Sequence, residues 1–146
     1  MTATLVNTAV TAMVAALQSA PAVCESVERG RRRAVSQDHD MAIVVRPVQS
    51  EVTQDAMAFG TPVLWLTSVA VECYARSGAN VAADLAVDPL IDAAYARLLL
   101  DPTLGGTVVL IKPQGIGYDF DADGQQVTCA TLVFHIVHRT QGNTLG

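Results

Sequence analysis

Charged side chains are scarce in this sequence, and their scarcity limits the classes of function that it can serve. They make up 16% of the 146 residues, against about 25% in a typical soluble domain, whereas hydrophobic residues make up 51%. A monomer of this composition has few polar groups to cover its surface, which predicts association with other chains. The net charge of -5 excludes a general positive field for nucleic acid or anionic membranes, so any DNA contact is expected to be incidental.

Cysteine is also rare, and its spacing gives no sign of a disulfide framework. The chain has three cysteines, Cys24, Cys73 and Cys129, which lie far apart and form no C-x-x-C pair. An odd number of isolated cysteines is typical of reduced, buried thiols in a reducing compartment.

Long apolar runs are missing, so the sequence predicts no membrane span. The first 24 residues carry no charge and contain Ala20-Pro21-Ala22, which superficially resembles a secretory cleavage site. However, no Lys or Arg precedes the apolar stretch, and Thr, Asn and Gln interrupt it. Val6, Val10, Met13 and Leu17 recur at helical spacing, which predicts an amphipathic helix of the mature protein ending before Pro21.

Motifs of catalysis and metal binding are absent or incomplete. The chain has no G-x-S-x-G, no phosphate-binding loop and no G-x-G-x-x-G. Asp119, Asp121, Asp123 and Gly124 match the first half of a calcium-binding EF-hand loop, but Ala130 stands where the bidentate Glu is required. The segment therefore predicts an acidic hairpin turn. We expect no catalytic residue, no bound metal and no cofactor.

The three histidines do not form an evident metal site. His135 and His138 lie three apart on an expected strand, so alternation places them on opposite faces. His39 stands between Asp38 and Asp40, which allows a ligand cluster but is more typical of a solvated loop.

The coarse pattern predicts an α+β fold with a mixed or mainly antiparallel β-sheet, packed by an N-terminal helix and a central helix. In Val63–Arg76 alternate residues from Val63 to Ala75 are apolar or small, which predicts one core face containing Trp65 and Val69. In residues 80–100 we expect Asp88 as the N-cap and Pro89 as the first helical residue, after a turn or short helix.

The other elements are expected as follows. Strands are predicted at 23–28, 41–48 (closed by Pro47), 107–112, 117–120 and 127–139, a long loop at 49–61 and a loose tail at 140–146. No repeat or linker divides the chain, so residues 1–146 are predicted to form one domain.

A basic cluster follows the first expected strand, at the tip of a hairpin or in a loop. Four of the nine basic residues gather there: Arg29, Arg31, Arg32 and Arg33. The cluster could touch phosphates, remain a solvated loop, or dock on an acidic surface of a neighbouring subunit. The candidate acidic surface consists of Asp119, Asp121 and Asp123. The sequence leaves these three possibilities open.

The order of motifs in the second half resembles bacteriophage tail terminator proteins, the minor tail protein U-like group. The most specific piece is D-P-T-L-G-G at 101–106, which follows the Ala- and Leu-rich helix pattern of 83–100. The strand V-A-V-E-C-Y-A-R at 69–76 and the closing strand V-F-H-I-V-H-R-T at 133–140 support it. Residues 24–61 match the family only in outline.

The resemblance implies a homo-hexameric ring that caps the head-proximal end of the tail tube. Its partners would be the tail tube protein and a head-completion or neck protein, in the cytoplasm of a bacterial host and then in the virion tail. The family brings no catalytic residue. The alternatives are another head–tail connector protein, or a small-ligand-binding module or enzyme using residues 38–40, which would need a pocket beside them.

Overall fold

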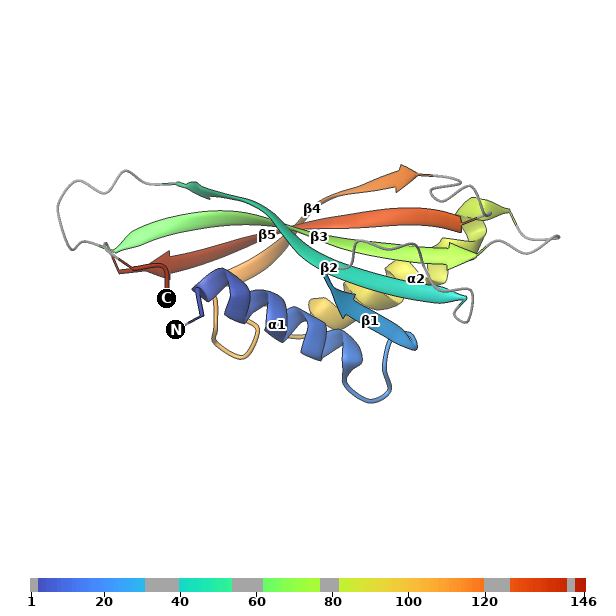
Figure 1. Cartoon of the computed structure of the whole chain (residues 1–146), viewed down its shortest axis with the longest axis horizontal. Helices are drawn as coiled ribbons and strands as arrows, with labels where there is room; N and C mark the ends of the chain where they lie inside the picture. The colour runs from blue at the N-terminus through green and yellow to red at the C-terminus, as the bar shows by residue number, and fades with distance from the viewer. Residues whose placement is uncertain (1–2, 31–39, 54–61, 77–81, 120–126, 142–143) are drawn as a thin grey trace.

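The computed structural model describes residues 3–30, 40–53, 62–76, 82–119, 127–141 and 144–146. It contains two helices and five strands (Figure 1). In chain order they are α1 (Leu5–Gln18), β1 (Ser26–Arg29), β2 (Met41–Val52), β3 (Val63–Arg76), α2 (Ala83–Leu98), β4 (Leu110–Asp119) and β5 (Val127–Thr140). The predicted α+β class is therefore confirmed.

The five strands form one mixed sheet in the order β1-β2-β3-β5-β4. β1 is parallel to β2, whereas the other three pairings are antiparallel. A hairpin joins antiparallel strands, so of the two predicted placements of the basic cluster, a hairpin tip or a loop, the hairpin tip is excluded. Figure 1 shows a strongly twisted sheet with both helices on the same side of it.

One face of the sheet forms the core with the two helices. Val69, Val71 and Cys73 of β3 and Phe134 and Ile136 of β5 belong to the same buried cluster. The predicted alternation of β3 is thus confirmed, although Trp65 is only half-buried. The opposite face of the sheet is covered by neither helix, which gives the protein two layers.

The N-terminal helix forms as the sequence predicts, and its polar and apolar sides explain its position. Thr4 caps it, because its side-chain oxygen accepts a hydrogen bond from Asn7 N. Val10, Met13 and Leu17 are fully buried. Burial of each such side chain contributes about 1.5–3 kcal/mol, so this apolar stripe fixes the helix on the sheet.

The predicted start of the central helix is wrong. α2 begins at Ala83, so Pro89 lies inside it rather than at its first position, and Ala82 is the N-cap. Proline in a helix interior costs about 3 kcal/mol, because it lacks the N–H that would bond to Leu85 O. Leu85 is exposed, so water can reach that carbonyl. The buried side of α2 outweighs the cost: Val87, Leu90, Ile91, Ala94 and Leu98.

Proline and glycine also misled the prediction of two strands. β2 continues past Pro47 to Val52, with a register shift between Pro47 and Gln49. β1 pairs with β2 only at 42–45, so Pro47 lies on an edge, where its missing N–H is tolerated. β4 likewise unites two predicted strands, with a register shift between Pro113 and Gly115.

The end of the chain is more tightly bound than the predicted loose tail. Thr140 belongs to β5 and is buried, and its hydroxyl accepts a hydrogen bond from Trp65 Nε1 at 2.8 Å. Leu145 O accepts a bond from Leu5 N at the start of α1.

Candidate functional site

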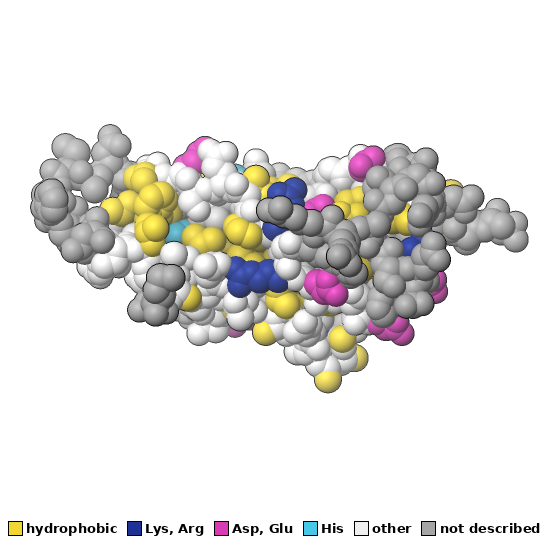
Figure 2. All heavy atoms as spheres, viewed as in Figure 1, with side chains coloured by type: hydrophobic (Ala, Val, Ile, Leu, Met, Phe, Trp, Pro, Cys, Tyr) yellow, Lys and Arg dark blue, Asp and Glu magenta, His cyan; other side chains and the backbone are white. Residues whose placement is uncertain are grey.

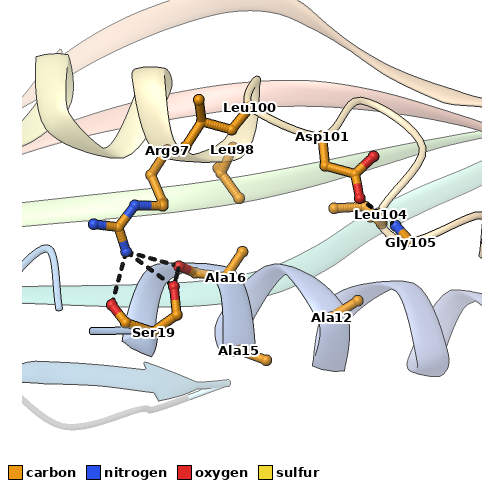
Figure 3. Close-up of a pocket in the computed structure, with 10 residues that line it drawn as sticks. All are labelled: Ala12, Ala15, Ala16, Ser19, Arg97, Leu98, Leu100, Asp101, Leu104 and Gly105. Atoms are coloured by element: carbon orange, nitrogen blue, oxygen red, sulfur yellow. Dashed lines mark hydrogen bonds between the residues drawn. The ribbon is translucent and has the colours of Figure 1, made fainter. Parts of the chain in front are cut away.

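A hollow of about 450 Å³ lies between α1 and the turn that links α2 to β4 (Figure 3). Its floor is apolar, because three alanines of α1 and three leucines line it: Ala12, Ala15, Ala16, Leu98, Leu100 and Leu104. A charged group stands at each end, Arg97 beside Ser19 and Asp101 beside Gly105. The hollow could hold a charged ligand only if one of these two groups is free to bind it.

Arg97 is already occupied by the end of α1. Its Nη1 donates to Ala16 O at 3.0 Å and to Ser19 O at 2.9 Å, and its Nη2 donates to Pro21 O at 2.6 Å. A cation is favourable at a helix C-terminus, where carbonyls lack partners within the helix. Arg97 therefore joins α1 to α2 rather than offering a free cation to a ligand.

Asp101 is the first residue of D-P-T-L-G-G, and it organises that turn. Its carboxylate accepts hydrogen bonds from Gly105 N at 2.7 Å and from the hydroxyl of Thr103 at 2.8 Å. The bond from Thr103, followed by that from Gly105, lowers the pKa of Asp101. Gly105 and Gly106 have φ values of 71° and 85°, which favour glycine. The D-P-T-L-G-G segment is thus a turn capped by its own aspartate.

A second hollow, of about 310 Å³, separates α2 from β4. Tyr95 of α2 and Ile116 and Tyr118 of β4 line it with exposed aromatic and apolar surface. Asp88 and Asp92 add two carboxylates on the helix side. The exposed tyrosines are typical of surfaces that contact other proteins, whereas carboxylates are depleted there.

Several exposed apolar side chains lie on β2 and β4. Val48 and Val52 on β2, and Leu110, Ile116 and Tyr118 on β4, are between 38% and 54% exposed. Figure 2 shows hydrophobic side chains reaching the surface in several patches, with charged groups beside some of them. Part of the excess of apolar residues in the composition is therefore exposed at the surface of the folded protein.

A buried polar cluster joins β2, β3 and β5. His138 is 2% exposed, and its Nε2 lies 2.7 Å from Thr67 Oγ1, which lies 2.7 Å from Ser50 Oγ. Trp65 stacks on the imidazole with 6.5 Å between ring centroids. His138 Nδ1 has no hydrogen-bond partner among the described residues, and burial lowers the pKa of His138. As predicted, His138 and His135 lie on opposite faces of the sheet.

The alternative of an enzyme at residues 38–40 gains little support from this geometry. A hollow of about 380 Å³ does adjoin Asp40, with Cys24 and Glu25 on its wall. Burial raises the pKa of the Cys24 thiol, which keeps it protonated and weakly nucleophilic. Asp38 and His39 lie outside the described residues, and the described part of the chain contains no group of three potential metal ligands.

The thiols match the predicted buried state in part. Cys73 and Cys129 are buried, Cys24 is half-buried, and all three are free.

The contact residues that the sequence predicts are only partly described. Arg29 bonds to α1, donating to the Asn7 side chain and, at 2.9 Å, to Thr11 Oγ1. It therefore fixes the helix to β1. Asp119 is the exposed last residue of β4. Arg31, Arg32, Arg33, Asp121 and Asp123 lie outside the described residues, so their role in contacts stays a prediction.

The sequence reasoning missed the exposed residues of β4. The signal was present as I-x-Y at 116–118, but Gly115 and Gly117 obscured the alternation. Without a structure, an exposed apolar residue beside glycines cannot be distinguished from part of a loop.

Together the fold and these surfaces define a two-layer α+β protein whose most conspicuous features are apolar sheet edges. None of its described helices has the length and apolar character needed to cross a membrane. No protein-family model matches the chain, and no curated protein sequence matches it either.

Proposed function

We propose that this protein is a structural component of a bacteriophage or prophage tail, which caps the head-proximal end of the tail tube as a hexameric ring. In this position it stops polymerisation of the tube protein and presents a joining surface to a head-completion or neck protein. The protein acts by surface complementarity, so no bond is made or broken.

The observation that carries the proposal is the exposed apolar surface of β4, an outer strand, and of β2, which β1 covers only at 42–45. Val48 and Ile116 are 54% and 47% exposed. A chain with only 16% charged residues has few means of keeping such strands apart from other proteins. Stable contacts with other subunits explain both features at once.

The family resemblance supplies the particular assembly. D-P-T-L-G-G at 101–106 forms the turn between α2 and β4, and V-F-H-I-V-H-R-T at 133–140 lies within β5. Both motifs occur in the order that the resemblance requires. A ring of identical subunits uses two different patches on each one, and closes if every contact rotates by a sixth of a turn.

The test is the length of tails in lysates of the phage or prophage that carries this gene, measured by electron microscopy. We expect deletion of the gene to give overlong tubes, and the native protein to restore uniform length. A variant with Arg31, Arg32 and Arg33 replaced by Glu should restore length less well while keeping the native thermal midpoint.

The outcomes separate the proposal from its rival. Tails of normal, uniform length that fail to join heads would contradict tube termination and favour another connector protein. If tails without the protein have normal length and join heads, both the terminator and the connector function are contradicted.

A further inference from the structure

Each end of the sheet has a strand segment whose outer edge pairs with no described strand. On β2, pairing with β1 ends at Val45, and the next contact is Gly30 N donating to Val45 O. On β4, Ile111 N donates to Pro102 O, and the strand that pairs with Lys112–Asp119 is β5. These two segments, Arg46–Val52 and Lys112–Asp119, are called the β2 edge and the β4 edge.

Among the described residues, both edges have partial protection near one end. Pro47 and Pro113 each remove a backbone donor and stand beside a register shift, devices that discourage strand addition. Beyond the prolines lie five residues of β2, 48–52, and six of β4, 114–119, and each group contains one charged residue. The two segments are therefore similar in length and carry little charge.

We propose that the β4 edge of one copy adds to the β2 edge of the next copy, so that the sheet continues from subunit to subunit. The inference rests on the proposed ring and names the surface through which its subunits join. Main-chain hydrogen bonds provide the affinity, and the exposed side chains of Val48 and Ile116 are buried at the join.

The topology determines the direction of this pairing. Three antiparallel steps lead from β2 through β3 and β5 to β4, so β2 and β4 of one copy run in opposite directions. A neighbouring copy in the same orientation presents its β2 edge antiparallel to β4. A ring keeps all subunits in the same orientation relative to its axis, and the contact is head-to-tail, as ring closure requires.

Charge complementarity selects the same direction. Arg46 and Glu51 on β2, and Lys112 and Asp119 on β4, all lie on the sheet face away from the helices, as their registers with β3 and β5 show. Antiparallel pairing brings Asp119 towards Arg46 and Lys112 towards Glu51. Parallel pairing would bring like charges together at both ends, which is destabilising.

The test is crosslinking between single cysteines on the two edges with a short bis-maleimide. Gln49→Cys marks the β2 edge and Gly117→Cys the β4 edge, where a Cβ would meet no atom within 4 Å. Cys24→Ser removes the half-buried thiol from every sample. Cys73 and Cys129 are buried, and burial raises the pKa of each, so they react slowly.

We expect a mixture of the two single-cysteine proteins to give a crosslinked dimer, and the protein with both cysteines to give a ladder. Each single-cysteine protein alone should give no dimer. Dimers from one variant alone would show a two-fold contact and overturn the proposal, as would the absence of crosslinks at the highest soluble concentration.

A charged residue placed on the β4 edge provides an independent test. Ile116→Lys should abolish the crosslink, because an edge lysine opposes strand addition. Leu100→Lys is the matched control, since Leu100 is 79% exposed and outside both edges. Crosslinks that persist in Ile116→Lys would overturn the edge contact. If the protein assembles but gives no crosslinks between the edges, the proposed edge contact is wrong and the proposed ring is not affected. If the crosslinks form but the protein does not restore tail length, the proposed function is wrong and the edge contact is not affected.

Discussion

At the scale of single residues, His138 is the most unusual side chain of the described structure. Its imidazole lies among Thr67, Ser50 and Trp65, with Nδ1 unpaired within the described residues. The sequence predicted that it lies opposite His135, because alternation along a strand is local information. Its burial could not be predicted, because its partners come from strands distant in the chain.

This environment predicts a pH-dependent stability. Burial lowers the pKa of His138 from its ordinary value of 6.5. As the pH falls, the unfolded chain therefore binds a proton at this residue before the folded chain does. The free energy of unfolding should therefore decrease as the pH falls below about 6.5 towards the folded pKa. Urea unfolding followed by the fluorescence of Trp65, the only tryptophan, measures it.

Two variants isolate the contribution of His138. His138→Gln keeps a polar side chain that does not titrate, so its stability should depend less on pH between 7.5 and 5. His135→Gln, on the opposite face of the same strand, should keep the native dependence. If the free energy of unfolding depends equally on pH in the native protein and in His138→Gln, another group causes the pH dependence.

At the scale of elements, the regular strands were predictable and the interrupted ones were not. β3 and β5 alternate without proline or glycine, so their limits follow closely from the sequence. α2, β2 and β4 each contain a proline that reads locally as a boundary. In each case tertiary packing or an edge position offsets the lost hydrogen bond, and neither is visible in local sequence.

The connection between the two helices gives a prediction at this scale. Arg97→Ala removes the donor to the carbonyls of Ala16, Ser19 and Pro21, so it should lower the free energy of unfolding by about 1–3 kcal/mol. Arg139→Ala, an exposed residue of β5, should change it by about 0.5 kcal/mol or less. Denaturant unfolding compares them, and equal effects would mean that Arg97 does not hold α1 in place.

At the scale of the whole molecule, composition predicted the need for partners but not the place of contact. The shortage of charge is a property of the entire chain, whereas Val48 and Ile116 become neighbours of a sheet edge only after folding. The candidate contacts chosen from sequence were charged, and the described structure adds apolar ones. Both kinds suit a ring, in which apolar surface gives affinity and charge gives direction.

The most direct test of this account is native mass spectrometry of the purified protein over a range of concentrations. We predict the 15.4 kDa monomer in dilute solution and a discrete species of six copies at high concentration, with no longer series. A ring closes, so its growth stops at one size. A monomer at every concentration, or an open-ended series of masses, would contradict the closed ring.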